Sequence, residues 1–223
     1  MEYRRAVERV ASREVRRQGL PTGLYAPQEL IQSVNVGLMD RLPYRATVAA
    51  SLYDAVRLPV AILLHNVRSM YNVGAFFRSA DGAGIERLLL SGITARPPKH
   101  AITKTALGAE ERVPWESAGD PRAAMDRLRD NGYEIAAIET SVRAVDIFDW
   151  QPRFPVCVVF GHEVDGLDAA LLEQCDRHVR LPMLGLKHSL NVASAGAVVM
   201  YELLRKYRML QNVRESSLQL PEK

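Results

Sequence analysis

The sequence predicts an α/β protein: a mostly parallel sheet with helices on both faces. From residue 59 onward, short apolar runs of strand length alternate with segments of helical spacing. The first run, VAILLHNV at 60–67, is apolar without alternation, as expected for a strand buried on both faces. Hydrophobic residues make up 48% and charged residues 25% of the chain, which excludes disordered and fibrous proteins.

The predicted elements follow one another regularly. Strands are expected at 60–67, 87–92, 133–140, 156–161 and 178–183, and helices at 73–84, 120–131, 166–175 and 189–208. The segment ARPPK at 95–99 is expected to be a loop. Residues 1–58 differ, with a basic amphipathic segment, a break near Pro21 and a helix start near Pro27. We therefore expect a helical N-terminal extension at 1–58 and the α/β domain at 59–223.

Charge and cysteine content narrow the functional classes. No apolar run is long enough to span a bilayer and the first twenty residues are charged throughout, so a cytoplasmic protein without a membrane contact is expected. Cys157 and Cys175 form no CxxC pair, and the histidines stand at no ligand spacing, so no metal site is expected. Residues 1–20 hold six arginines against three glutamates. That excess fits contacts to phosphate and equally a solvated helix face.

The segment after the first strand, HNVRSMYNVGAFFRSADGAG, is the first candidate for a site. Ligands of open parallel sheets bind beyond the carboxyl ends of the strands. Asn72 is expected to cap the next helix, and Arg78, nearly two turns along it, offers a planar guanidinium suited to phosphate. The plain alternatives are a simple helix cap for Asn72 and a surface ion pair for Arg78.

Two later segments also follow strands. In GHEVDGL at 161–167, Glu163 fits a general base, a hydrogen-bond acceptor or a carboxylate at a helix N-terminus. In LPMLGLKHSLNVASAGAVVMYE at 181–202, Ser189 is expected to cap the last helix and Asn191 to lie in its first turn. The run of alanine and glycine at 193–197 predicts that backbone or ligand approaches this helix closely.

Taken together and in this order, the three segments resemble the SpoU/TrmH family of SPOUT RNA 2′-O-ribose methyltransferases. The resemblance covers about residues 59–207 and rests on N-x5-R, on GxExxGL after a strand and on LPMxGxxxSLNVASA before a helix. It implies a deep trefoil knot at about 156–205, an S-adenosylmethionine pocket formed by it, and a homodimer whose active sites draw on both subunits. His162 and Val164 stand where many relatives carry other residues, which leaves the geometry of their loop open.

The resemblance also implies individual roles. Arg78 would bind the phosphate beside the target ribose and assist deprotonation of its 2′-hydroxyl. Because the pKa of arginine lies above about 12, stabilisation of charge is the safer physical role than general base. The residues expected to order the pocket and the substrate are Asn72, Glu163, Ser189 and Asn191, and those expected to contact the cofactor are Gly161, Leu181, Met183, Leu190 and Leu90.

The implied activity is transfer of a methyl group from S-adenosylmethionine to RNA, with transfer RNA favoured slightly over ribosomal RNA because the chain is compact. One alternative is a knotted RNA-binding protein that has lost catalysis, which the intact set of site residues disfavours. Another is a nicotinamide or flavin oxidoreductase, which lacks its glycine fingerprint after the first strand.

Overall fold

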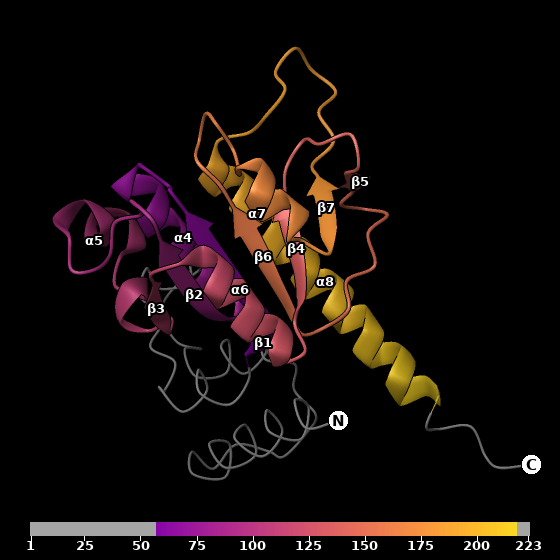
Figure 1. The fold of residues 1–223 in the computed structure, drawn as a ribbon. Coiled ribbons are helices and arrows are strands. Elements are labelled where there is room, and N and C mark those ends of the chain that lie inside the picture. Colours follow the sequence, from indigo (N-terminus) through magenta and orange to yellow (C-terminus); the bar gives the residue numbers. More distant parts are fainter. Residues whose placement is uncertain (1–56, 218–223) are drawn as a thin grey trace, which may run out of the picture. The chain divides into compact units, whose positions relative to one another are not determined.

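The computed structural model describes residues 57–217, which form a seven-stranded sheet covered by helices (Figure 1). The extension predicted at 1–58 lies almost wholly outside the described residues. The strands are β1 (Leu58–His65), β2 (Ile85–Ser91), β3 (Trp115–Ala118), β4 (Glu134–Ile138), β5 (Val145–Asp146), β6 (Val156–Phe160) and β7 (Arg177–Arg180). The helices are α4 (Met70–Ala83), α5 (His100–Ala106), the 3-10 turn η1 (Ala109–Glu111), α6 (Pro121–Asp130), α7 (Ala169–Glu173) and α8 (Val192–Ser217). None of these helices is both long and apolar enough to cross a membrane.

The strand order is β3-β2-β1-β6-β4-β7-β5, and all neighbouring strands run parallel. The predicted α/β class with a parallel sheet is confirmed. Because the strands share one direction, all of their carboxyl ends lie at one edge of the sheet. Two late strands occupy interior positions, β6 between β1 and β4 and β7 between β4 and β5. The second and third motifs, which follow β6 and β7, therefore begin next to strands that come earlier in the sequence.

The sheet buries both of its faces. Ile62 of β1 packs with Phe76 of α4 in one core, whereas Leu63 packs with Met125 of α6 in the other. Successive side chains of a strand point to opposite faces, so both sets of residues in β1 need to be apolar. Burial of each such side chain contributes about 1.5–3 kcal/mol. This double burial explains why the strand shows no alternation in its sequence.

The small residues of α8 allow close contact with α4, as the sequence predicts. A Cβ atom at Gly196 would lie 2.3 Å from the ring of Phe76, which is itself fully buried. Phe76 packs edge-to-face on Phe160 of β6, with the ring centroids 5.1 Å apart. Glycine at 196 thus lets α8 lie directly on the aromatic pair that joins α4 to the sheet.

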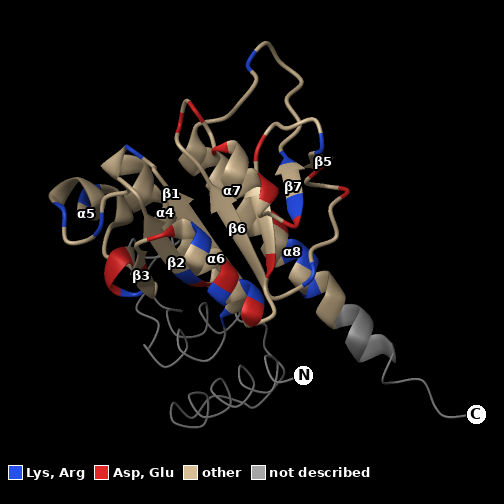
Figure 2. Cartoon of the chain, in the orientation of Figure 1, with Lys and Arg blue, Asp and Glu red and all other residues tan. Residues whose placement is uncertain are grey.

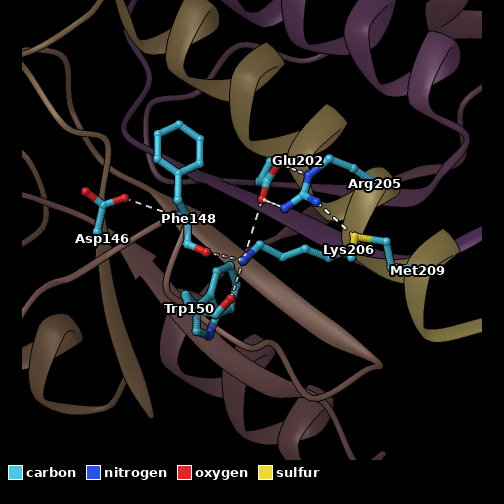
Figure 3. Close-up of polar contacts among 7 residues, drawn as sticks. All are labelled: Asp146, Phe148, Trp150, Glu202, Arg205, Lys206 and Met209. Atoms are coloured by element: carbon cyan, nitrogen blue, oxygen red, sulfur yellow. Dashed lines mark hydrogen bonds and ion pairs between the residues drawn. The ribbon is translucent and has the colours of Figure 1, made fainter. Parts of the chain in front are cut away.

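A buried lysine fastens α8 to the segment that follows β5 (Figure 3). Lys206, which is 6% exposed, donates to the backbone oxygens of Phe148 (3.1 Å) and Trp150, and its Nζ lies 3.5 Å from Glu202 Oε1. Glu202 also accepts hydrogen bonds of 2.6 and 2.7 Å from the exposed Arg205. Each N–H of the ammonium group therefore has an acceptor, which is the condition for burying a charge without a large penalty.

The sequence missed four short elements, α5, η1, β3 and β5. The helix α5 has seven residues, no side-chain cap at Lys99 and two buried positions, Ile102 and Ala106. The strands β3 and β5 have four and two residues. Elements of this length show too few residues for a periodic pattern to stand out. Contacts with neighbouring elements select their conformation instead.

Candidate active site

A pocket of about 270 Å³ opens at the carboxyl edge of the sheet, beside β4, β6 and β7. Four segments form its walls: the end of β4, the loop after β6, the loop after β7 and the start of α8. The lining residues are 138–140, 160–166, 180, 181, 183, 188–190, 192 and 195. Because this edge is where open parallel sheets bind ligands, the pocket lies where the second and third motifs predict it.

The carboxylate of Glu163 ties the pocket loop to the start of α4. Its Oε1 accepts hydrogen bonds from the backbone N–H of Ser69 and from Nδ2 of Asn72, and its Oε2 accepts one from the backbone N–H of Arg68, all at 3.0 Å. Burial alone would raise the pKa of Glu163, but these hydrogen bonds outweigh burial and hold the pKa below its usual value. Of the three roles open from the sequence, the structure supports a hydrogen-bond acceptor at a helix start.

Asn72 extends this connection to α8. Its Oδ1 accepts a hydrogen bond of 3.2 Å from Nδ2 of Asn191. The Oδ1 of Asn191 in turn accepts from the backbone N–H groups of Ala193 (2.9 Å) and Ser194 (3.3 Å). One residue from each of the three motifs, Glu163, Asn72 and Asn191, therefore belongs to a single chain of hydrogen bonds. Such chains fix their members more firmly than isolated pairs do.

Two predicted helix caps are wrong. The cap of α4 is Ser69, whose Oγ accepts from the backbone N–H of Asn72 at 3.4 Å. The cap of α8 is Asn191, two residues after the predicted Ser189, because the oxygen that accepts from the first turn belongs to Asn191. Serine and asparagine are equally good caps, so the sequence offers two candidates at each helix start and the tertiary contacts choose between them. Ser189 instead lines the pocket.

The loop after β6 has a compact form. The backbones of His162 and Gly166 exchange two hydrogen bonds of 3.0 Å, and His162 Nδ1 accepts from the N–H groups of Val164 (3.3 Å) and Asp165 (3.2 Å). A Cβ atom at Gly161 would lie 2.4 Å from the backbone of Gly166. Glycine at 161 is therefore required for the loop to fold back on the strand. His162 and Val164, the two departures from the family pattern, are accommodated in this fold.

Six of the ten predicted site residues line the pocket directly: Gly161, Glu163, Leu181, Met183, Ser189 and Leu190. Asn72 and Asn191 join it through the hydrogen-bond chain. Leu90 does not reach it, because this fully buried residue lies on β2, which the whole width of β1 separates from β6. The family resemblance, which implied a role for Leu90, did not specify which strands are neighbours.

Arg78 also lies outside the pocket of its own chain. Its side chain is exposed and forms no hydrogen bond or ion pair with any other described residue, so the surface ion pair considered from the sequence is not observed. It follows Asn72 by six residues, which places it about 9 Å further along the axis of α4.

Sequence reasoning missed Glu139, which lines the pocket at the carboxyl end of β4. Its Oε2 accepts a hydrogen bond of 3.3 Å from the backbone N–H of Leu167, and its Oε1 accepts one of 2.9 Å from that of Thr140. The sequence did contain a signal for Glu139. The predicted strand 133–140 has two acidic residues, and Glu139 is the one near its carboxyl end. Within residues 57–217, no three His, Cys, Asp or Glu side chains are grouped as ligands for a metal ion.

Comparison with known proteins decides which family this architecture represents. The model of the SpoU rRNA Methylase family matches residues 59–201. The chain belongs to the SpoU rRNA methylase family. The resemblance carried by the three motifs is thereby confirmed, and the oxidoreductase alternative is excluded.

This SpoU protein is similar in sequence to curated proteins and in fold to solved structures. The chain is 30% identical over 155 residues to a putative TrmH family tRNA/rRNA methyltransferase of Staphylococcus epidermidis. The match covers 70% of this chain and 62% of the relative. The chain thus spans about three fifths of the length of this curated relative. The SpoU methyltransferase AviRb of Streptomyces viridochromogenes, solved with the cofactor AdoMet, has a TM-score of 0.61 and 28% identity over 69% of this chain and 63% of that one. A solved RNA 2′-O ribose methyltransferase has a TM-score of 0.60 and 27% identity over 80% of this chain and 70% of that one.

Proposed function

We propose that this SpoU family protein transfers the methyl group of S-adenosylmethionine to a ribose 2′-hydroxyl of RNA, with transfer RNA favoured slightly over ribosomal RNA. The observation that carries the proposal is the pocket formed by the second and third motifs and tied to the first by Glu163, Asn72 and Asn191. The AdoMet-bound AviRb and the solved ribose methyltransferase support it, since both share the fold.

The residues that line the pocket suit S-adenosylmethionine in polarity and charge. Leu181, Met183 and Leu190 supply apolar walls of the kind that accept an adenine ring. The carboxylates of Glu139 and Glu163 lie in the same walls and favour a cationic ligand. When bound, the cofactor supplies an electrophilic methyl group on a positively charged sulfur. We assign Gly161, Leu181, Met183 and Leu190 to its site and leave Leu90 out.

The protein's own residues then have to prepare the acceptor. A ribose hydroxyl is a weak nucleophile until its proton leaves, so the enzyme gains most by holding it in line and stabilising the developing negative charge. The guanidinium of Arg78, free of any described partner, is suited to bind the adjoining phosphate and to supply that stabilisation. Asn72, Glu163, Ser189 and Asn191 keep the start of α4 and the start of α8 in position beside it.

We further propose that residues 156–205 are knotted and that the protein acts as a homodimer in the cytoplasm. The interior positions of β6 and β7 fit a segment that passes through a loop formed by the preceding chain. Arg78 lies outside the pocket of its own chain, which fits an active site shared by two subunits.

The test combines cofactor binding with methyl transfer. We expect calorimetry to show uptake of S-adenosylmethionine by the full chain, and labelled methyl groups to appear in total RNA at alkali-resistant 2′-O-methyl linkages. Arg78→Ala is expected to abolish turnover and to leave cofactor affinity near that of the unaltered protein. Full activity of Arg78→Ala would refute the role of the arginine, and absence of cofactor uptake by the unaltered protein would refute the proposed function as a whole.

A further inference from the structure

The cations of the described residues divide into those paired with carboxylates and those without a partner. Exposed arginines on one side of the sheet are paired, as in Arg129 with Asp126 on α6 and Arg143 with Glu173 of α7, both at 2.8 Å. In α4, α5 and the segments that precede them, five cations form no side-chain hydrogen bond or ion pair with any described residue. They are the exposed Arg68, Arg78, Lys99 and Lys104, and Arg96, whose Nε is buried.

The sequence around Lys99 and Lys104 carries no acid, whereas Asp81 follows Arg78 by three positions on α4 and the backbone N–H of Arg68 donates to Glu163. Neither 66–80 nor 87–109 contains an aspartate or glutamate, and these two segments include the first part of α4 and all of α5. Figure 2 shows blue and no red in α5, whose one charged residue is Lys104, whereas α6 carries both signs. Exposed charge of one sign without neighbours of the other produces a local positive potential.

The helix α5 is packed firmly against the start of α4. Thr105 Oγ1 donates a hydrogen bond of 3.0 Å to the backbone oxygen of Tyr71. A Cβ atom at Gly74 would lie 2.0 Å from Thr105 Oγ1 and 2.4 Å from the backbone oxygen of Ile102. Arg78 follows Gly74 by one helical turn, so it lies on the side of α4 that faces α5. The cations of the two helices therefore belong to one surface of fixed geometry.

This surface adjoins the pocket through direct contacts. Tyr71, which accepts the hydrogen bond from α5, precedes Asn72, and Asn72 donates to Glu163 in the pocket wall. Lys99 ends the segment that leaves β2 at the same carboxyl edge of the sheet. RNA that reaches Arg78, whether its reacting group enters this pocket or the pocket of a partner subunit, would thus pass over α5.

We propose that Lys99 and Lys104, together with Arg68, form a phosphate-binding surface that holds the RNA strand flanking the target nucleotide. The inference rests on the proposed function and adds to it the contact surface for the substrate. Lysine ammonium groups bind phosphate as point charges and need no particular base, so this surface positions the RNA without reading its sequence. Release of condensed counterions on binding makes such contacts strongly dependent on salt.

The test removes Lys99, which precedes α5, and Lys104 of α5 in the full-length protein. Lys99→Gln/Lys104→Gln is compared with Arg127→Gln/Arg143→Gln, which removes the same charge from two exposed arginines that are paired with Glu116 and Glu173. Binding of transfer RNA is titrated at several salt concentrations, and kcat, KM for RNA and calorimetric affinity for S-adenosylmethionine are measured in parallel. Thermal unfolding verifies that each variant is folded, and the two single lysine variants serve if the double variant is not.

For the lysine pair we expect RNA affinity to fall at least tenfold, with KM for RNA rising and kcat and cofactor affinity unchanged. The slope of log K against log salt should become shallower by about 1.4–1.8, since each phosphate contact contributes about 0.7–0.9. Each single lysine variant should show about half of that change in slope, and the arginine double variant should show little change.

An unchanged slope and affinity in the lysine pair, or an equal loss in the arginine pair, would overturn the proposed surface. If the unaltered protein methylates RNA and the double lysine variant binds RNA equally well, the proposed phosphate-binding surface is wrong and the proposed function stands. If the unaltered protein fails to bind S-adenosylmethionine, the proposed function is wrong, and the salt dependence still reports on the surface.

Discussion

Replacement of Glu163 by glutamine should weaken the connection between the pocket loop and α4. Glutamine offers one oxygen and one NH2 group where the carboxylate offers two acceptors. If the NH2 takes the place of Oε2, the backbone N–H of Arg68 loses its acceptor. If it takes the place of Oε1, the backbone N–H of Ser69 and the Nδ2 group of Asn72 lose theirs. A hydrogen bond to a charged group contributes about 1.5–3 kcal/mol. Since the site is partly open to water, we expect the free energy of unfolding to fall by about 1.5–2 kcal/mol.

Urea denaturation at neutral pH measures this loss, and hydrogen exchange at the amides of Arg68 and Ser69 locates it. The matched control is Asp165→Asn, a carboxylate of the same loop that is 82% exposed and contacts His162. Because the pKa of Glu163 is lowered in the folded state, its contribution is present above the unfolded pKa of about 4.3 and is lost as pH falls through the folded value. Equal stabilities of the two variants would show that the carboxylate does not stabilise the site.

Two further substitutions test the fold around the site. Lys206→Met leaves the backbone oxygens of Phe148 and Trp150 without a donor, so the free energy of unfolding in urea should fall by about 3 kcal/mol or more, whereas Arg205→Met should change it far less. Equal losses in the two variants would contradict the buried-lysine argument. Burial lowers the pKa of His65, with Asp168 and Asp120 opposing the shift in part, and its Nε2 accepts a 2.9 Å hydrogen bond from Asn66. Protonation therefore disfavours folding, so stability should decline as pH falls below about 6.5, and His65→Gln should flatten that decline in a series of urea titrations.

The sequence predicted the long buried strands of the sheet better than the short elements around them. The strands at 60–67 and 156–161 were evident because both of their faces are buried, which leaves unbroken apolar runs such as VCVVF. The helix α5 was missed because its conformation depends on Gly74 and Thr105, residues that meet only after the chain has folded. The order of the strands was also beyond reach, since an apolar run does not specify its neighbours.

The site residues that could be predicted are those that come directly after a strand in the sequence. The rule that ligands bind at the carboxyl edge placed Gly161, Leu181 and Ser189 correctly at the pocket. Leu90 was assigned to the pocket through the family resemblance alone, and it lies on β2, which β1 separates from the pocket. The rule could not show that Glu163 accepts hydrogen bonds from residues more than ninety positions earlier, since that pairing depends on β6 lying next to β1.

The position of Arg78 outside its own pocket leads to a test for sharing of the site between subunits. Met183→Arg would place a cation in the pocket wall and exclude the cationic cofactor, which calorimetry can verify, while Arg78→Ala leaves the pocket intact. If Arg78 serves the partner's pocket, a dimer of one variant with the other regains one complete site, and an equal mixture contains about half of such dimers. By the symmetry of a two-fold dimer, methyl transfer should return to about one quarter of the unaltered rate. If Arg78 serves its own pocket, the mixture stays as inactive as either variant alone, because neither chain then carries both an intact pocket and its arginine.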